Sequence, residues 1–152
     1  MLNKGDKAPD FSLETDQGKQ VSLKDFSGSR LVLYFYPKDN TSGCTTEALE
    51  FTALADQFKD MGAVIVGVSP DSVKSHVNFK EKHNLDIILI SDPDKTLCQA
   101  YDVWREKSMY GRKYMGVLRS TFIISPDGFI EDAMYNVKAK GHAESILCEL
   151  KK

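Results

Sequence analysis

Three runs of the chain are continuously apolar, with no polar alternation. They are LVLYFY at 31–36, AVIVGV at 63–68 and IILI at 87–90. Strands that are covered on both faces have this pattern, so the runs predict three buried strands at the centre of a sheet. Ahead of them, FSLETDQGKQVSL alternates on both sides of Asp16, Gln17 and Gly18, which predicts a hairpin at an edge or end of the sheet.

The segments between and after these strands have helical spacing. Apolar residues three and four apart predict one helix from about Cys44 to Met61, with a stripe made of Ala48, Phe51, Ala55 and Phe58. A second helix after 69–71 ends near Asn84 and connects two parallel strands. The rest of the chain predicts a short helix in 94–104, a hairpin in 120–135 that turns at 126–128, and a C-terminal helix from 142.

This order of elements predicts the fold class. Strands that alternate with helices, followed by a hairpin and a last helix, favour an α/β protein with a mixed central sheet and helices on both faces. The 152 residues, 41% of them apolar, suffice for one core, so we expect a single domain over 1–152. In such sheets, functional groups gather where strands end and helices begin.

Charge and cysteine content limit the possible partners and the cellular compartment of the protein. Twenty basic and 22 acidic residues give a net charge of −2 without a basic run, which disfavours nucleic acid and anionic membranes as partners. We expect a cytoplasmic protein, because the N-terminus lacks the apolar core of a signal peptide and no apolar stretch approaches the roughly 20 residues of a membrane span. Three widely spaced cysteines do not form a disulfide framework and suit a reducing compartment.

Cys44 lies where a buried strand gives way to a helix. In the first helical turn, its sulfur would face unpaired backbone N–H groups and the positive end of the helix dipole, which favour the thiolate. Thr41 offers a hydroxyl and Pro37 an apolar wall. The alternative is that PKDNTSG is an ordinary turn and Cys44 a small buried hydrophobe. Spacing alone favours neither interpretation.

A resemblance to a known family favours the reactive-thiolate interpretation of Cys44. Pro37, Thr41 and Cys44 in YPKDNTSGCTTE match the P-x-x-x-T-x-x-C pattern of the peroxiredoxins, and Glu47 matches an acidic residue that often follows it. The likeness continues at GDKAPDFSL, GVSPDS, DVWREKSMYGRKYMG and RSTFIISPDG. Over almost its whole length the chain resembles peroxiredoxins, most of all the bacterioferritin comigratory protein or peroxiredoxin Q group.

The resemblance implies a role for each matching residue. Cys44 would be the peroxidatic cysteine, Thr41 the hydroxyl that bonds the peroxide, and Pro37 the shield against water. Arg119 would place its guanidinium over the thiolate, and Glu47 would orient that arginine. Displacement at a peroxide oxygen needs the sulfur and both oxygens nearly in line, with donors that steady the departing oxygen.

The resemblance also implies the fold and the activity. We expect a thioredoxin-like fold and a thiol peroxidase that reduces hydrogen peroxide and organic hydroperoxides, without metal or organic cofactor, as a monomer or weak homodimer. The amides of Gly43 and Cys44 would supply further donors to the substrate. A second hypothesis of another class is a redox-sensing binding protein on the same scaffold, in which oxidised Cys44 alters a partner contact without turnover.

The chain departs from the family in its other cysteines. Many members of this group carry the resolving cysteine five residues after the first, where this chain has Leu49, and DSVKSHVNFKEKH contains none. Cys98 shares an apolar helical face, which favours packing, and Cys148 lies off the C-terminal stripe, which favours exposure. Both stay candidate resolving residues, but we expect a one-cysteine mechanism in which thioredoxin, glutaredoxin or glutathione attacks the sulfenic acid.

Two histidines lie seven residues apart on the second predicted helix. His76 and His83 share a helical face, yet no cysteine or carboxylate pattern completes a metal site around them. The sequence therefore predicts surface histidines and no metal.

Overall fold

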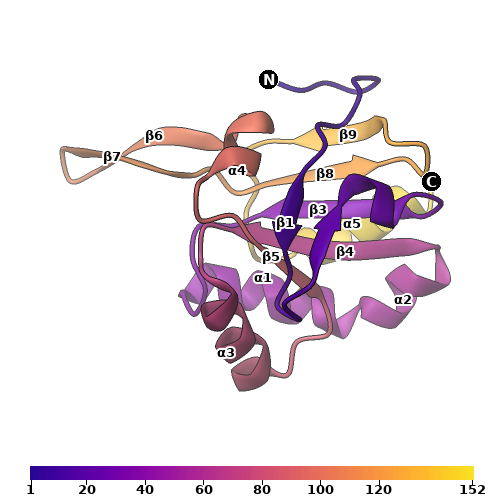
Figure 1. Ribbon diagram of the computed structural model, residues 1–152, viewed down its shortest axis with the longest axis horizontal. Helices are drawn as coiled ribbons and strands as arrows, with labels where there is room; N and C mark the ends of the chain where they lie inside the picture. The colour runs from indigo at the N-terminus through magenta and orange to yellow at the C-terminus, as the bar shows by residue number, and fades with distance from the viewer.

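A five-stranded mixed sheet forms the middle of the protein, as Figure 1 shows for the computed structural model of residues 1–152. The strand order is β5-β4-β3-β8-β9, in which β3, β4 and β5 are parallel and β8 and β9 are antiparallel to their neighbours. The mixed α/β sheet is confirmed. The strands are β3 Arg30–Phe35, β4 Ala63–Ser69, β5 Ile88–Ser91, β8 Ser120–Ile124 and β9 Ile130–Met134.

The third apolar run does not lie at the centre of the sheet. β5 is an edge strand, and β8 occupies the inner position beside β3 instead. The run is continuously apolar because both of its faces are covered, with Leu89 in one core and Ile90 in the other. The N-terminal hairpin, β1 Ser12–Glu14 and β2 Gln20–Ser22, lies against its outer edge. Thr15 bridges Ile90, and Asp16 bonds Leu89 through both its amide and its carboxylate. The predicted hairpin and its edge location are both confirmed.

The helix predicted over 44–61 is two helices. α1 spans Ser42–Ala53 and α2 spans Ala55–Asp60. Leu54 leaves the helical path at φ −102° and ψ 6°, and its N–H is shared between the carbonyls of Glu50 and Phe51. The apolar stripe survives the break, because Phe51 and Phe58 are both fully buried. The break thus bends the segment without changing the face that it presents to the sheet.

The other helices agree with their predicted places. They are α3 Val73–His83, α4 Thr96–Ala100 and α5 His142–Leu150, with a short 3₁₀ turn at Leu23–Phe26. α4 is shorter than the predicted 94–104 segment, because Asp102 takes a left-handed conformation at φ 59° and ends the helix there. None of the helices has the length and apolar character that crossing a bilayer requires.

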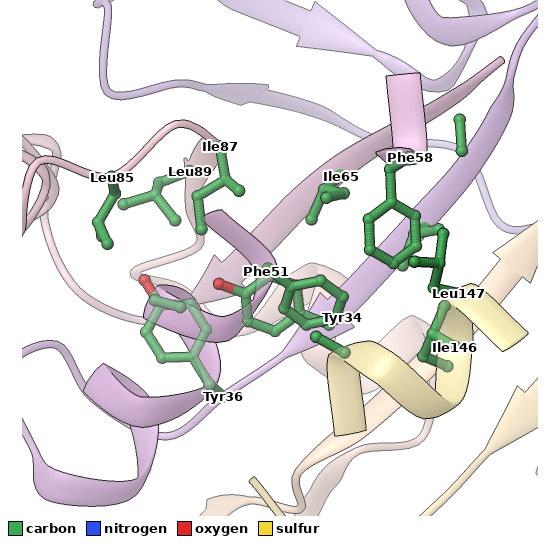
Figure 2. Packing of buried hydrophobic residues seen from close by; sticks show 14 of the residues in the cluster. Tyr34, Tyr36, Phe51, Phe58, Ile65, Leu85, Ile87, Leu89, Ile146 and Leu147 are labelled. Carbon is green, nitrogen blue, oxygen red and sulfur yellow. The ribbon is translucent and has the colours of Figure 1, made fainter. Parts of the chain in front are cut away.

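The two faces of the sheet have separate cores. Alternate residues of β3 point to opposite sides, so Tyr34 joins one core and Phe35 the other. On the first face, residues of α1, α2, α3 and α5 pack around Tyr34, whose ring stacks on Phe51 at 4.7 Å (Figure 2). On the second face, α4 and the N-terminal segment pack around Phe35 and Phe122. Helices therefore lie on both faces, as predicted.

A hairpin that the sequence pattern does not predict projects from the body of the protein (Figure 1). Its strands are β6 Trp104–Met109 and β7 Arg112–Val117, and its turn is formed by Tyr110 and Gly111, both with positive φ. Tyr110 is 99% exposed, so no neighbouring core fixes this tip. Its strands are not visible in the sequence, because polar and apolar residues alternate only weakly in this segment.

Candidate active site

The fold brings Cys44 to the first turn of α1, directly after the loop that follows β3. Thr41 caps the helix in an extended conformation, and the first helical hydrogen bond runs from the Thr45 amide to the Thr41 carbonyl. The amides of residues 42–44 therefore have no carbonyl partner within the helix. Cys44 is only 2% exposed. Its sulfur thus lies at the positive end of α1 and largely out of bulk water.

Arg119 joins this cysteine to Glu47. One guanidinium nitrogen, Nη2, lies 3.3 Å from Cys44 Sγ, and the other, Nη1, donates to Glu47 Oε1 at 2.6 Å. Strand register explains how residues 75 positions apart meet, because Ser120 of β8 pairs with Phe35 of β3. Arg119 therefore lies at the same end of the sheet as the loop into α1. The predicted contacts of Arg119 with both residues are present.

Burial and the mutual contacts of Cys44, Glu47 and Arg119 shift the pKa values of Glu47 and Arg119. Burial raises the pKa of Glu47 from 4.5 to about 7, although the neighbouring Arg119 opposes the shift. Burial acts to lower the pKa of Arg119, but Glu47 and Cys44 outweigh it and the pKa is raised. The guanidinium is therefore a permanent cation at physiological pH. It holds a proton donor against the sulfur whatever the state of Glu47.

The other predicted residues surround the sulfur less directly. The Thr41 hydroxyl is exposed and donates to the Lys38 carbonyl at 2.8 Å, which leaves its oxygen free to accept a hydrogen bond. Pro37 is half-buried at the start of the loop. A Cβ on Gly43 would lie 3.2 Å from Arg119 Nη2, so the missing side chain lets the guanidinium approach the helix. No hydrogen bond links Thr41 to the sulfur.

The structure adds groups that the sequence pattern did not single out. The buried Tyr34 hydroxyl and Glu47 Oε2 have no protein partner, and burial, reinforced by Glu47 and Cys44, raises the pKa of Tyr34. Burial and Arg119 lower the pKa of His142 to about 4, so it is neutral where its Nε2 lies 2.7 Å from the Thr121 hydroxyl. Burial lowers the pKa of Lys107 of β6, the charge of Arg119 adds to this shift, and Cys44 opposes it.

The remaining cysteines lie apart from this site. Cys98 is fully buried in the core on the opposite face of the sheet from Cys44, and burial raises the pKa of its thiol. Cys148 is exposed on α5, and all three thiols are free. Leu49, five residues after Cys44, is 42% exposed on α1. The predicted packing of Cys98 and exposure of Cys148 are both found.

One prediction for the histidines is wrong. His76 is fully buried and bonded to Asp39, and only His83 is partly exposed. Their helix, α3, packs against the sheet on the side that carries His76. The partner, Asp39, lies 37 residues away in the sequence, beyond the reach of any spacing pattern.

Comparison with known proteins places this geometry in a family. The AhpC/TSA family model matches residues 4–133. The chain is 48% identical to peroxiredoxin Bcp of Bacillus subtilis over 147 residues, which cover 97% of this chain and 94% of that protein. This chain belongs to the AhpC/TSA family, in the Bcp/PrxQ group of peroxiredoxins. It is a peroxidase with the thioredoxin-like peroxiredoxin fold.

Other relatives agree with this assignment. The chain is 48% identical to a putative peroxiredoxin bcp of Helicobacter pylori over 146 residues, 96% of each chain. A cysteine-to-serine mutant of Xanthomonas campestris peroxiredoxin Q superposes with a TM-score of 0.92 at 47% identity, over 99% of this chain and 98% of that one. A Xylella fastidiosa PrxQ mutant gives 0.94 at 44% identity, over 99% and 96%.

The raised pKa of Glu47 in this peroxiredoxin predicts a pH-dependent stability. Between pH 4.5 and 7 the folded protein holds a proton on Glu47 that the unfolded chain has lost, so stability falls as pH rises through this window. The size of the effect is roughly 3 kcal/mol. Glu47→Gln removes the titration, so the unfolding free energy of the variant should gain about that amount relative to wild type between pH 4.5 and pH 8.

Urea unfolding at both pH values measures this difference. Glu50→Gln, on the same helix, is the matched control for the loss of one carboxylate, and its stability should run parallel to wild type. A Glu47→Gln curve that also runs parallel to wild type would contradict the assignment.

Proposed function

We propose that this peroxiredoxin reduces hydrogen peroxide and organic hydroperoxides through Cys44. The cysteine thiolate attacks the terminal peroxide oxygen, so that a sulfur–oxygen bond forms as the oxygen–oxygen bond breaks. Cys44 becomes a sulfenic acid, and the departing oxygen takes a proton and leaves as water or an alcohol. A solved Xanthomonas campestris bacterioferritin comigratory protein, 49% identical to this chain, is described for alkyl peroxide reduction, which supports the organic substrates.

The bridge from Glu47 through Arg119 to Cys44 carries this proposal. A guanidinium 3.3 Å from the sulfur stabilises the thiolate and offers a donor to the developing negative charge. Glu47 orients the guanidinium by accepting a hydrogen bond from Arg119 Nη1 at 2.6 Å. The amides of Gly43 and Cys44 add donors at the N-terminus of α1. The Thr41 oxygen accepts a hydrogen bond from the peroxide hydroxyl, and Pro37 limits the access of water. Catalysis then rests on alignment more than on a more reactive sulfur.

Reduction of the sulfenic acid needs an external thiol in our proposal. Cys98 is buried in the other core, and Cys148 is exposed on α5 without a motif around it. We therefore propose a one-cysteine cycle in which thioredoxin, glutaredoxin or a small thiol such as glutathione attacks the sulfur of Cys44. The thiol and the sulfenic acid form a mixed disulfide and release water, and a second thiol restores Cys44. The working unit is a single domain that acts in the cytoplasm as a monomer or weak homodimer.

Turnover with dithiothreitol tests the function. With dithiothreitol in excess, wild type should consume many equivalents of hydrogen peroxide or cumene hydroperoxide, and Cys44→Ser should consume none. Cys148→Ser is the matched control, and it should turn over like wild type because dithiothreitol reaches Cys44 directly. Consumption that stops after one equivalent would identify a redox sensor rather than a peroxidase.

Mass spectrometry tests the one-cysteine cycle. One equivalent of peroxide should leave Cys44 as a sulfenic acid that dimedone traps, with Cys98 and Cys148 still reduced. An internal disulfide between Cys44 and either other cysteine would contradict the external-thiol mechanism. That result would leave the peroxidase assignment intact.

A further inference from the structure

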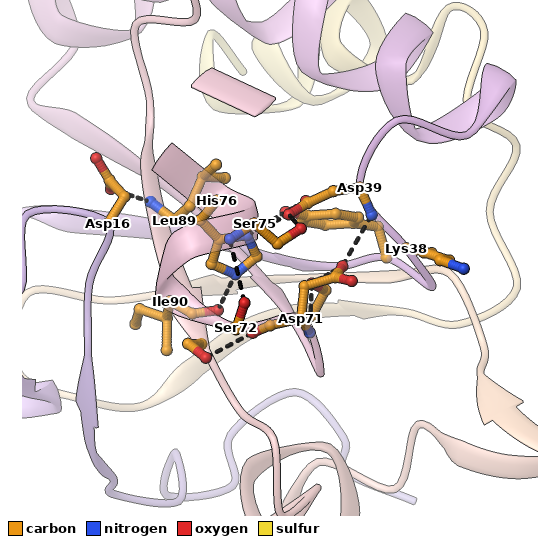
Figure 3. Close-up of polar contacts among 12 residues, drawn as sticks. Asp16, Lys38, Asp39, Asp71, Ser72, Ser75, His76, Leu89 and Ile90 are labelled. Atoms are coloured by element: carbon orange, nitrogen blue, oxygen red, sulfur yellow. Dashed lines mark hydrogen bonds and ion pairs between the residues drawn. The ribbon is translucent and has the colours of Figure 1, made fainter. Parts of the chain in front are cut away.

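A buried polar cluster lies beneath the loop that carries Thr41 (Figure 3). Asp39 is in this loop and His76 is on α3, and their side chains are 1% and 0% exposed. Asp39 Oδ2 lies 2.7 Å from His76 Nδ1, and the other ring nitrogen, Nε2, lies 2.9 Å from the Ile90 carbonyl oxygen. A carbonyl only accepts, so Nε2 must donate to it. A second proton lies between Nδ1 and the Asp39 carboxylate, so both ring nitrogens of His76 take part in hydrogen bonds.

The cluster fixes Asp39 through its side chain and through its backbone. Oδ1 accepts from the Tyr36 hydroxyl at 2.6 Å, and Oδ2 also accepts from the Ser75 hydroxyl at 2.8 Å. The Asp39 amide donates to Asp71 Oδ2 at 2.8 Å. Asp71 follows β4 and also accepts from the Ser69 hydroxyl. One loop residue is thereby tied to the ends of two strands and to α3.

These contacts lie close to the reacting groups in the chain. Asn40, between Asp39 and Thr41, takes φ 62°, a left-handed conformation that asparagine tolerates, and turns the chain into α1. The direction of the Thr41 hydroxyl and of the first helical amides therefore follows from where Asp39 is held. The loop has no other buried side-chain anchor, since Lys38, Asn40 and Thr41 are exposed.

The cluster contains residue types that bind metals, but hydrogen bonds already occupy their ligand atoms. Ligand atoms of Asp39, Asp71 and His76 lie within 4.8 Å of one another. Both nitrogens of His76 are engaged, and the closest carboxylate oxygens each accept two hydrogen bonds. A cation would have to displace all of these, so the arrangement is a structural hydrogen-bond network.

We propose that the buried Asp39–His76 pair is a positioning element for peroxide reduction, which holds residues 37–41 so that Thr41 and the amides of the first helical turn meet the peroxide at Cys44. The inference rests on the proposed roles of Cys44 and Thr41. A misplacement of about 1 Å among reacting groups can lower a rate by about 100-fold. Loss of the pair should therefore slow the reaction with peroxide more than it alters the thiolate itself.

Two reactions of Cys44 separate positioning from stability. Hydrogen peroxide needs the thiolate and the aligned donors, whereas alkylation by iodoacetamide needs only an accessible thiolate. In Asp39→Ala, and independently in His76→Gln, the rate constant with hydrogen peroxide should fall by about 10- to 100-fold. The rate of alkylation should stay within about 3-fold of wild type, since the Arg119 contact is intact.

Two further variants complete the test. Asp39→Asn keeps the network, because its oxygen accepts from Tyr36 and its amide donates to His76 Nδ1, so its peroxide rate should return to within about 3-fold of wild type. Lys80→Gln breaks the 2.9 Å contact between α3 and Asp16, one helical turn after His76 and outside the Asp39 network, and is the control for a loosened α3. It should lower the melting temperature and leave the peroxide rate unchanged.

The outcomes distinguish this inference from the proposed function. A peroxide rate that is normal in both Asp39→Ala and His76→Gln would overturn the positioning role alone. A peroxide rate that falls in parallel with alkylation, or falls equally in Lys80→Gln, would also overturn it, because stability would then explain the loss. A wild-type Cys44 that does not react with peroxide would overturn the proposed function, and the inference with it.

Discussion

The arrangement of this protein depends on one partly buried cation, the guanidinium of Arg119. Arg119 holds a guanidinium between the carboxylate of Glu47 and the sulfur of Cys44, where its charge meets little water. A buried charge is costly unless it is paired, and here two partners on α1 provide the pairing. The same contacts place a fixed donor beside the sulfur. Stability and chemistry at this site therefore share one set of hydrogen bonds.

The fold serves to bring these groups together. β3 and β8 lie side by side, so the residue before β8 reaches the helix that follows β3. α1 presents Cys44 and Glu47, one turn apart, toward that residue. Phe51 anchors the same helix against Tyr34 in the core. Beneath the loop, the Asp39–His76 pair ties the chain ahead of α1 to a second helix, so both ends of the site rest on buried groups.

The sequence predicts those parts that depend on local pattern. Buried strands at 31–36 and 63–68 stand out because both their faces are covered, and the motif around Cys44 identifies the site. The break at Leu54 is less visible, because the apolar stripe continues through it. The edge position of β5 is hidden in the sequence, because both faces of this edge strand are buried like those of an inner strand.

The contacts of the site depend on tertiary structure and could not be read from spacing. Glu47 and Arg119 meet through strand register across 72 residues, and His76 is buried because Asp39 and the Ile90 carbonyl bond both its nitrogens. A histidine on a polar helix resembles a surface residue until these partners are placed. Tyr34, Lys107 and His142 likewise gain their altered pKa values only from folded neighbours.

The rate constant for the reaction of Cys44 with hydrogen peroxide in Arg119→Lys tests the central claim most directly. Lysine has one charged nitrogen in place of a rigid fork, and cannot reproduce the two contacts that join Glu47 to the sulfur. The account predicts a fall of about 100-fold or more. Arg30→Lys, at the separate Arg30–Glu131 pair, should leave the rate unchanged. A rate for Arg119→Lys within about 3-fold of wild type would contradict the claim that this guanidinium drives the chemistry.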